Sequence, residues 1–365
     1  QNADLGKGIL QLFLGPFSGL RPVKELGNMI FYTVPLIFTG LSVAIAYKTG
    51  LFNIGAPGQF LAGTGVSLYI ALSIDSTGKP VQGFFVWLLA VLAGMVAGML
   101  VGAIPGLLKA TLGINEVIIC IMTNWIAANG FTWFFSTQPQ LTNTSNGKSG
   151  FLIKTAVTGN GTPSGFLTEW TENSYLDIGI FVAIVVSILL WVLMKKTTFG
   201  YSLRACGLNH FSAKYAGIDE KKYIILSMMI AGGLAALGGC FYYLNPGIEV
   251  SYLTVYQRLP SYGFDGIPVA LLANCNPIAV LFAALFMRYL SASGSFLVTS
   301  GFNRYFADLI SAFIIYLSGF SKFFFDGFSS LSKKHHDKRN IYYLNLLTMD
   351  LLPKKNEAYE KKGGK

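Results

Sequence analysis

Polar residues interrupt a strongly apolar sequence between Gly50 and Gln59. The stretch carries Asn53, Pro57 and Gln59 together with three glycines, and the apolar runs on both sides are long enough to enter a lipid bilayer. Amide side chains offer a donor and an acceptor to a polar solute, and Pro and Gly interrupt a helix. A short loop between two helices is the structural alternative. We favour a broken helix that lines a transport pathway, because hydrocarbon tolerates exposed backbone only beside protein or a wet cavity.

Ionisable and amide groups occur in two further apolar stretches. Glu116 lies about one turn into an apolar span, and Asn124 lies deeper in the same span, whereas Asp265 belongs to the sequence Gly-Phe-Asp-Gly-Ile-Pro. A position at the membrane interface for Glu116, and a helix–helix hydrogen bond for Asn124, are the structural alternatives. The candidate contacts to a polar solute are therefore Phe52, Asn53, Gln59, Glu116, Asn124, Phe264 and Asp265.

Composition indicates an all-α, polytopic membrane protein. Of the 365 residues, 53% are hydrophobic and 12% are charged, about half the charged fraction of soluble domains. The net charge of +10 comes mainly from two hydrophilic blocks, Lys195–Lys222 and Lys333–Lys365. Membrane topology explains these blocks better than nucleic-acid binding does.

The sequence offers no set of residues for catalysis on this chain. It lacks a phosphate-binding P-loop, its three histidines lie in hydrophilic stretches, and its four cysteines are scattered. We therefore predict no catalytic residue, no metal site, no disulfide framework and no cofactor.

Apolar runs of about 20 residues predict nine helices in this chain and about ten in the whole protein. The expected spans are Met29–Tyr47, Gln59–Ile74, Phe84–Leu108, Ile114–Phe135, Tyr175–Met194, Tyr223–Leu244, the two halves of Tyr262–Phe296, and Tyr305–Phe320. The predicted organisation has an extracytoplasmic segment at 1–28 whose first helix is missing, a transmembrane domain at 29–320 and a cytoplasmic tail at 321–365.

Cations predict the orientation of the spans. By the positive-inside rule, residues 195–222 and the tail are cytoplasmic, and the cation-poor loop at 136–174 is external. This orientation requires Tyr262–Phe296 to be split, and the Asn-Pro pair within Asn274–Pro277 is a natural break. The two broken stretches, Gly50–Gln59 and Gly263–Leu272, then enter from opposite sides, as in an inverted repeat whose broken helices meet near the bilayer midplane.

Four motifs resemble the permease subunits of bacterial ABC importers for nucleosides and simple sugars. They occur in the family's order, and the nucleoside branch is the nearest through Phe-Asn-Ile-Gly-Ala and Asn-Glu-Val-Ile. Two departures are Pro57, where the family usually has Glu, and Pro268, where Ala is common. The four motifs are Gly50–Gln59, Gly113–Asn124, Gly200–Asn209 with Tyr215–Ile218, and Gly263–Leu272.

The resemblance implies a type II importer fold and several partners. These are a second, homologous permease that completes the pore as a heterodimer, an ABC ATPase that binds ATP and Mg²⁺, and an extracytoplasmic substrate-binding lipoprotein. It also implies a coupling helix in the basic loop, for which a solvated connection is the alternative, and Asn209 is expected to cap that helix. The expected coupling residues are Gly200, Arg204, Gly207, Asn209, Ala213, Tyr215 and Gly217.

The resulting hypothesis is a subunit of an ATP-driven importer in the bacterial cell membrane, carrying nucleosides and in particular purine nucleosides. Ribose or galactose is the alternative solute. A rival from another class is an ion-coupled secondary transporter, in which Glu116 or Asp265 carries the proton or sodium ion. A structural membrane scaffold is the third option.

Overall fold

The computed structural model describes residues 5–17, 19–143, 148, 150–298, 301–303 and 305–319. Contacts within the chain define two units, Gln1–Ile315 and Tyr316–Lys365. The account below concerns the first unit. The predicted tail at 321–365 lies outside the described residues.

Each of the nine predicted spans corresponds to one helix, which confirms the helical fold class. Six helices of the described chain are long and apolar enough to cross a membrane: α2, α4, α5, α8, α11 and α13. The helices in chain order are α1 (Leu5–Leu14), α2 (Pro22–Lys48), α3 (Ala56–Ser73), α4 (Pro80–Leu112), α5 (Glu116–Ser136), α6 (Thr155–Thr158), α7 (Gly165–Trp170), α8 (Gly179–Lys196), α9 (Thr198–Leu208), α10 (His210–Tyr215), α11 (Glu220–Tyr243), α12 (Ser261–Leu272), α13 (Pro277–Leu297) and α14 (Phe306–Gly319), with short 3₁₀ turns at Gly15–Phe17 and Pro139–Leu141.

Two helices form the centre of the first unit. Within their most apolar windows, 89% of α2 and 78% of α11 is buried, against 28% of α8. Small residues of α4 and α11 meet at their contact, where Gly98 and Gly102 face Gly232. Such contacts let helix backbones approach closely in a membrane, where packing rather than water drives helix association. In contrast, at most 33% of the most apolar windows of α4, α5, α8 and α13 is buried, and these helices carry exposed apolar side chains.

The first break is shorter than predicted. Helix α2 ends at Lys48, Gly50 adopts φ +76°, and α3 already begins at Ala56. Pro57 lies in the first turn of α3, where its missing N–H would have had no helical partner. The interruption is therefore confined to residues 49–55.

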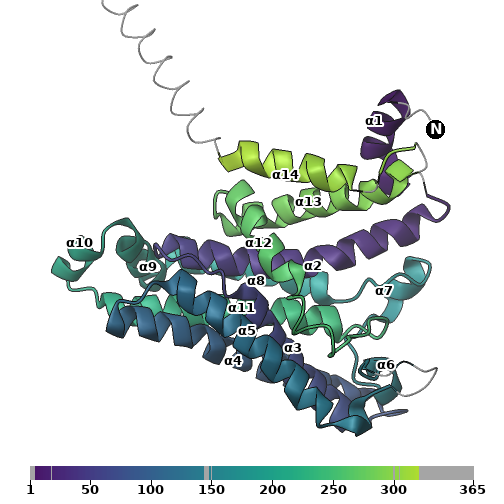
Figure 1. The fold of residues 1–365 in the computed structure, drawn as a ribbon, viewed down its shortest axis with the longest axis horizontal. Coiled ribbons are helices and arrows are strands. Elements are labelled where there is room, and N and C mark those ends of the chain that lie inside the picture. Colours follow the sequence, from purple (N-terminus) through teal and green to yellow (C-terminus); the bar gives the residue numbers. More distant parts are fainter. Residues whose placement is uncertain are drawn as a thin grey trace, which may run out of the picture. The chain divides into compact units, whose positions relative to one another are not determined.

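The second break lies after the predicted motif and not within it. Residues Ser261–Leu272 form the continuous helix α12, so the expectation that Gly263–Leu272 is itself broken was wrong. The predicted split at Asn274–Pro277 is confirmed: Asn274 and Cys275 have φ +48° and +53°, and α13 begins at Pro277. A helix of 12 residues is about 18 Å long, too short to span a hydrocarbon core of about 30 Å. Figure 1 shows α12 between α2 and α13, with which it packs.

Candidate functional site

A pair of buried amides, Asn53 in the first break and Gln59 in the first turn of α3, joins the break to that helix. Asn53 Nδ2 donates to Gln59 Oε1 at 2.8 Å and to Ser42 Oγ at 3.0 Å. Gln59 Nε2 and the N–H of Gly55 donate in return to Asn53 Oδ1, at 3.2 and 3.0 Å. Both amide side chains are at most 1% exposed. These bonds join α2 to the start of α3 without ordinary helical pairing.

Asn124 of α5 secures the same break from the other side. Its Oδ1 accepts the N–H of Gly58 at 2.8 Å, and its Nδ2 donates to the backbone oxygen of Ile54 at 2.9 Å. Helix N-termini leave backbone N–H groups without intrahelical partners, and Asn124 supplies a partner from a neighbouring helix. The structure thus brings Asn53, Gln59 and Asn124 together, with their amides bonded within the protein. Solute contact by these three side chains remains a prediction.

The two predicted motifs touch at Gly263 and Pro57. A Cβ atom on Gly263 would lie 2.5 Å from Pro57 Cα, so only glycine permits this approach of α12 to α3. Beside this contact, Phe264 is 38% exposed and Phe52 is half-buried. The structure therefore places the two motifs side by side at the start of α3.

Glu116 pairs with a cation and not with another candidate residue. Its carboxylate lies 3.0 Å from Lys109 Nζ, and it is the first residue of α5. Asn115 caps the helix by accepting the N–H of Val117 at 2.9 Å. An acidic residue in the first turn also interacts favourably with the helix dipole. These contacts give Glu116 a structural role at the end of α5, and a place in the solute pathway remains a prediction.

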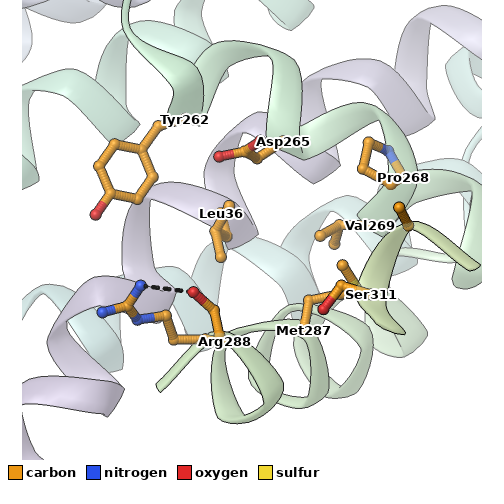
Figure 2. A pocket seen from close by; sticks show the side chains of 10 residues that line it. Leu36, Tyr262, Asp265, Pro268, Val269, Met287, Arg288 and Ser311 are labelled. Carbon is orange, nitrogen blue, oxygen red and sulfur yellow. Dashed lines mark hydrogen bonds between the residues drawn. The ribbon is translucent and has the colours of Figure 1, made fainter. Parts of the chain in front are cut away.

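Asp265 lines a cavity that contains polar residues missed in the sequence analysis. The cavity has a volume of about 290 Å³. Figure 2 shows Tyr262 and Asp265 of α12 on one wall and Arg288 of α13 on the opposite wall, with Ser311 at one side. The sequence signal for Arg288 was an arginine within an apolar run, which in a membrane is a functional-site hypothesis by default.

Arg288 is held mainly by a ring contact and only weakly by hydrogen bonds. Its guanidinium lies over the ring of Tyr32 on α2, 4.5 Å from the ring centroid, a favourable cation–π distance. Its Nη1 reaches Ser291 Oγ only at 3.5 Å. Arg288 Nε and Ser311 Oγ are buried without a hydrogen-bond partner in the described chain.

The basic loop forms two short helices, α9 and α10. Asn209 accepts the N–H of Ser212 at 3.1 Å, which confirms its predicted helix cap. Arg204 Nε bonds within α9 to the oxygen of Gly200 at 3.4 Å. Ala213 is buried, whereas Tyr215 is 93% exposed, and Gly217 has φ +77° just after α10. Exposed apolar side chains gather here: Leu208, Phe211 and Tyr215.

Helix α9 contacts the entrance to the first break. A Cβ atom on Gly207 would lie 2.2 Å from the backbone oxygen of Lys48 and 3.0 Å from the N–H nitrogen of Gly50. Gly200 approaches the end of α8 in the same way, 2.1 Å from the oxygen of Leu193. The exposed surface of α10 is therefore joined through α9 to the residues that begin the break.

Residues 26–319 match the family described as the branched-chain amino acid transport system / permease component. The chain belongs to this permease family. Its match covers every candidate residue described above, together with α9 and α10. The chain is accordingly a membrane transport component and not an enzyme.

Relatives named as ABC transporter permeases match most of the chain. Nucleoside ABC transporter permease protein NupB of Lactococcus lactis subsp. cremoris is 36% identical over 82% of this chain and 80% of its own length. Guanosine ABC transporter permease protein NupP of Bacillus subtilis is 34% identical over 86% of this chain and 85% of its own length. Glucose ABC transporter permease protein TsgB13 of Haloferax volcanii is 29% identical over 82% of this chain and 77% of its own length. No solved structure matches the chain significantly.

Proposed function

We propose that this chain is the membrane subunit of an ATP-driven importer of nucleosides, with purine nucleosides as the principal solutes. The observation that carries the proposal is the match to NupB and NupP over at least four fifths of each chain. TsgB13, named for glucose, is less similar at 29% identity. Simple sugars are therefore the alternative solute and not the first choice.

The proposed complex contains three further kinds of subunit. A second, homologous permease forms the pore with this chain as a heterodimer. On the cytoplasmic side an ABC ATPase binds ATP and Mg²⁺, and on the opposite side an extracytoplasmic lipoprotein delivers the solute. The family description of a permease component supports the presence of other components. The exposed Leu208, Phe211 and Tyr215 provide the ATPase with an apolar docking surface on α9 and α10.

The proposed coupling runs through backbone contacts. Closure of the ATPase pushes α10, and α9 transmits the displacement to Lys48 and Gly50 through the contact at Gly207. Because Asn124 and Pro57 tie the start of α3 to α5 and α12, the shift at the break moves those helices together. Packed interfaces of this kind switch between discrete arrangements and do not deform continuously.

The test is uptake by the assembled complex in membrane vesicles. Labelled guanosine should enter only with ATP, and unlabelled adenosine should compete more strongly than ribose or glucose. Preferred uptake of a sugar would replace the nucleoside assignment with the alternative. Uptake driven by a proton or sodium gradient through this chain alone would contradict the ATP-driven mechanism and favour the secondary transporter.

A further inference from the structure

Three cavities follow α2 from its first turns to its last. The first, about 330 Å³, is lined by Glu25, Asn28 and Tyr32. The second is the cavity of about 290 Å³ beside Leu36. The third, about 320 Å³, is lined by α2 residues 44, 45 and 48 and by the residues of the second break. Helix α13 lines all three in the reverse order.

Arg288 stands where the first two cavities adjoin. It lines both of them, and its guanidinium covers Tyr32, which belongs to the first cavity. The orientation predicted from the cations places the first cavity on the extracytoplasmic side. In that orientation Arg288 lies between the extracytoplasmic cavity and the second cavity.

Two polar groups that line the second cavity lack a hydrogen-bond partner in the described structure. Ser311 is 8% exposed and its Oγ has no hydrogen-bond partner in the described structure. The buried Nε of Arg288 is also without one. Buried polar groups in native proteins are almost always hydrogen-bonded, and leaving one unpaired is costly. A ligand that bonds to both groups would relieve this cost.

The chemistry of Arg288 restricts that ligand. A guanidinium donates hydrogen bonds and accepts none, so the edge of the ligand that faces it must carry acceptors. Among purines, guanine presents O6 and N7 as a pair of acceptors, whereas adenine presents N7 beside an amino donor. Ser311 adds a hydroxyl group on another side of the cavity, and this suits a hydroxyl of a ribose.

We propose that the second cavity is an intramembrane transit site for 6-oxopurine nucleosides, in which Arg288 bonds to the acceptor edge of the base and Ser311 to the sugar. This inference rests on the proposed import of nucleosides and adds a site and a preference within that class. The site is separate from the bonded amides Asn53, Gln59 and Asn124.

Cysteine accessibility tests whether solute reaches the cavity. The four native cysteines are buried, so a Ser311→Cys variant in the assembled complex should react with a small charged methanethiosulfonate reagent above the wild-type background. Guanosine should slow this reaction, and cytidine should slow it less. The matched control is Val185→Cys, which lies on the exposed face of α8 and is expected to face lipid and to resist the charged reagent.

Substitution of Arg288 tests the preference. Arg288→Gln, which supplies both a donor and an acceptor, should lower the ratio of guanosine to adenosine uptake by about tenfold, and Arg288→Lys should retain more of the ratio. The delivering protein is unchanged in these variants, so a change in the ratio reports on this chain. An unchanged ratio in Arg288→Gln, or Ser311→Cys labelling that guanosine does not slow, would overturn the transit site while wild-type guanosine uptake still supported nucleoside import. Absence of nucleoside uptake by the wild type would instead overturn the proposed function itself.

Discussion

Amide side chains at the first break act as connectors between helices. Asn124 alone holds one backbone donor and one backbone acceptor of residues 54–58, and both bonds are shorter than 3.0 Å. In the hydrocarbon core of a membrane these backbone groups cannot form hydrogen bonds with water. The arrangement explains how a helix can begin inside an apolar region without leaving its first turn unpaired.

Asn124→Ala should therefore destabilise the protein by about 1–3 kcal/mol or more, because it leaves the buried N–H of Gly58 unpaired, at about 1–3 kcal/mol, together with the part-buried oxygen of Ile54. The matched control is Asn129→Ala on the same helix, where an exposed amide bonds only to the oxygen of Trp125. We expect the control to change stability by less than about 0.5 kcal/mol. Denaturation in detergent measures both, and equal effects would refute a special role of Asn124.

Asp177 makes stability depend on pH. It lies in the connection before α8, where it accepts hydrogen bonds from Asn245 Nδ2 at 2.8 Å and from the N–H of Gly179 at 2.9 Å. Burial raises the pKa of this carboxyl to about 6, against about 3.9 in an unfolded chain. Between these values the folded chain holds a proton that the unfolded chain has released, so stability falls as the pH rises through this window.

The melting temperature of the purified protein should thus be higher at pH 5 than at pH 7.5. The variant Asp177→Asn cannot titrate at this position and should lose most of this difference. If wild type and variant show the same pH dependence, another group is responsible.

At the scale of elements, α9 is the link between an exposed surface and the first break. Its Gly207 lies against the backbone of Lys48, while α10 carries Phe211 and Tyr215 into solvent. A rigid helix that packs at Gly200 and Gly207 can carry a displacement from one contact to the other.

Gly207→Ala should separate binding from transport. The added Cβ would lie 2.2 Å from the oxygen of Lys48, so α9 must move away from α2, and ATP-driven uptake should fall by about tenfold. The ATPase should still co-purify, since the exposed side chains of Leu208, Phe211 and Tyr215 are retained. Gly130→Ala on α5 is the control, because nothing lies within 4 Å of the position that its new methyl group would take. Loss of ATPase binding with Gly207→Ala would contradict this division of roles.

At the scale of the whole molecule, orientation in the membrane decides the direction of transport. Two of the cations of the basic loop, Lys195 and Lys196, end α8, and further cations follow around α9 and α10. The positive-inside rule places this end in the cytoplasm. The connection between α3 and α4, which includes Lys79, must then lie on the external side.

Single-cysteine labelling tests this orientation. Lys79 and Tyr215 are both exposed, and all native cysteines are buried. A membrane-impermeant maleimide should label Lys79→Cys in intact cells and should label Tyr215→Cys only after permeabilisation. The opposite pattern would invert the topology and, with it, the assignment of α10 to the ATPase.

Local sequence determined the helices and part of their termini. Apolar runs of about 20 residues predict helices, and all nine predicted spans correspond to helices of the structure. Six of these, within the described residues, are long and apolar enough to cross a membrane. The helix cap at Asn209 and the split at Asn274–Pro277 also depend on nearby residues. Both predictions were confirmed. These features follow from the chain's own backbone chemistry.

Tertiary structure alone decided how the polar residues are used. Asn53, Gln59 and Asn124 differ little in type from solute-binding residues, and only their neighbours show that their amides are already bonded. Arg288 was an isolated cation in an apolar run until packing placed it between two cavities and over Tyr32. The physical reason is that a polar side chain is available to a ligand only when no neighbouring helix meets its hydrogen-bonding needs, and the neighbours are set by packing between segments distant in the sequence.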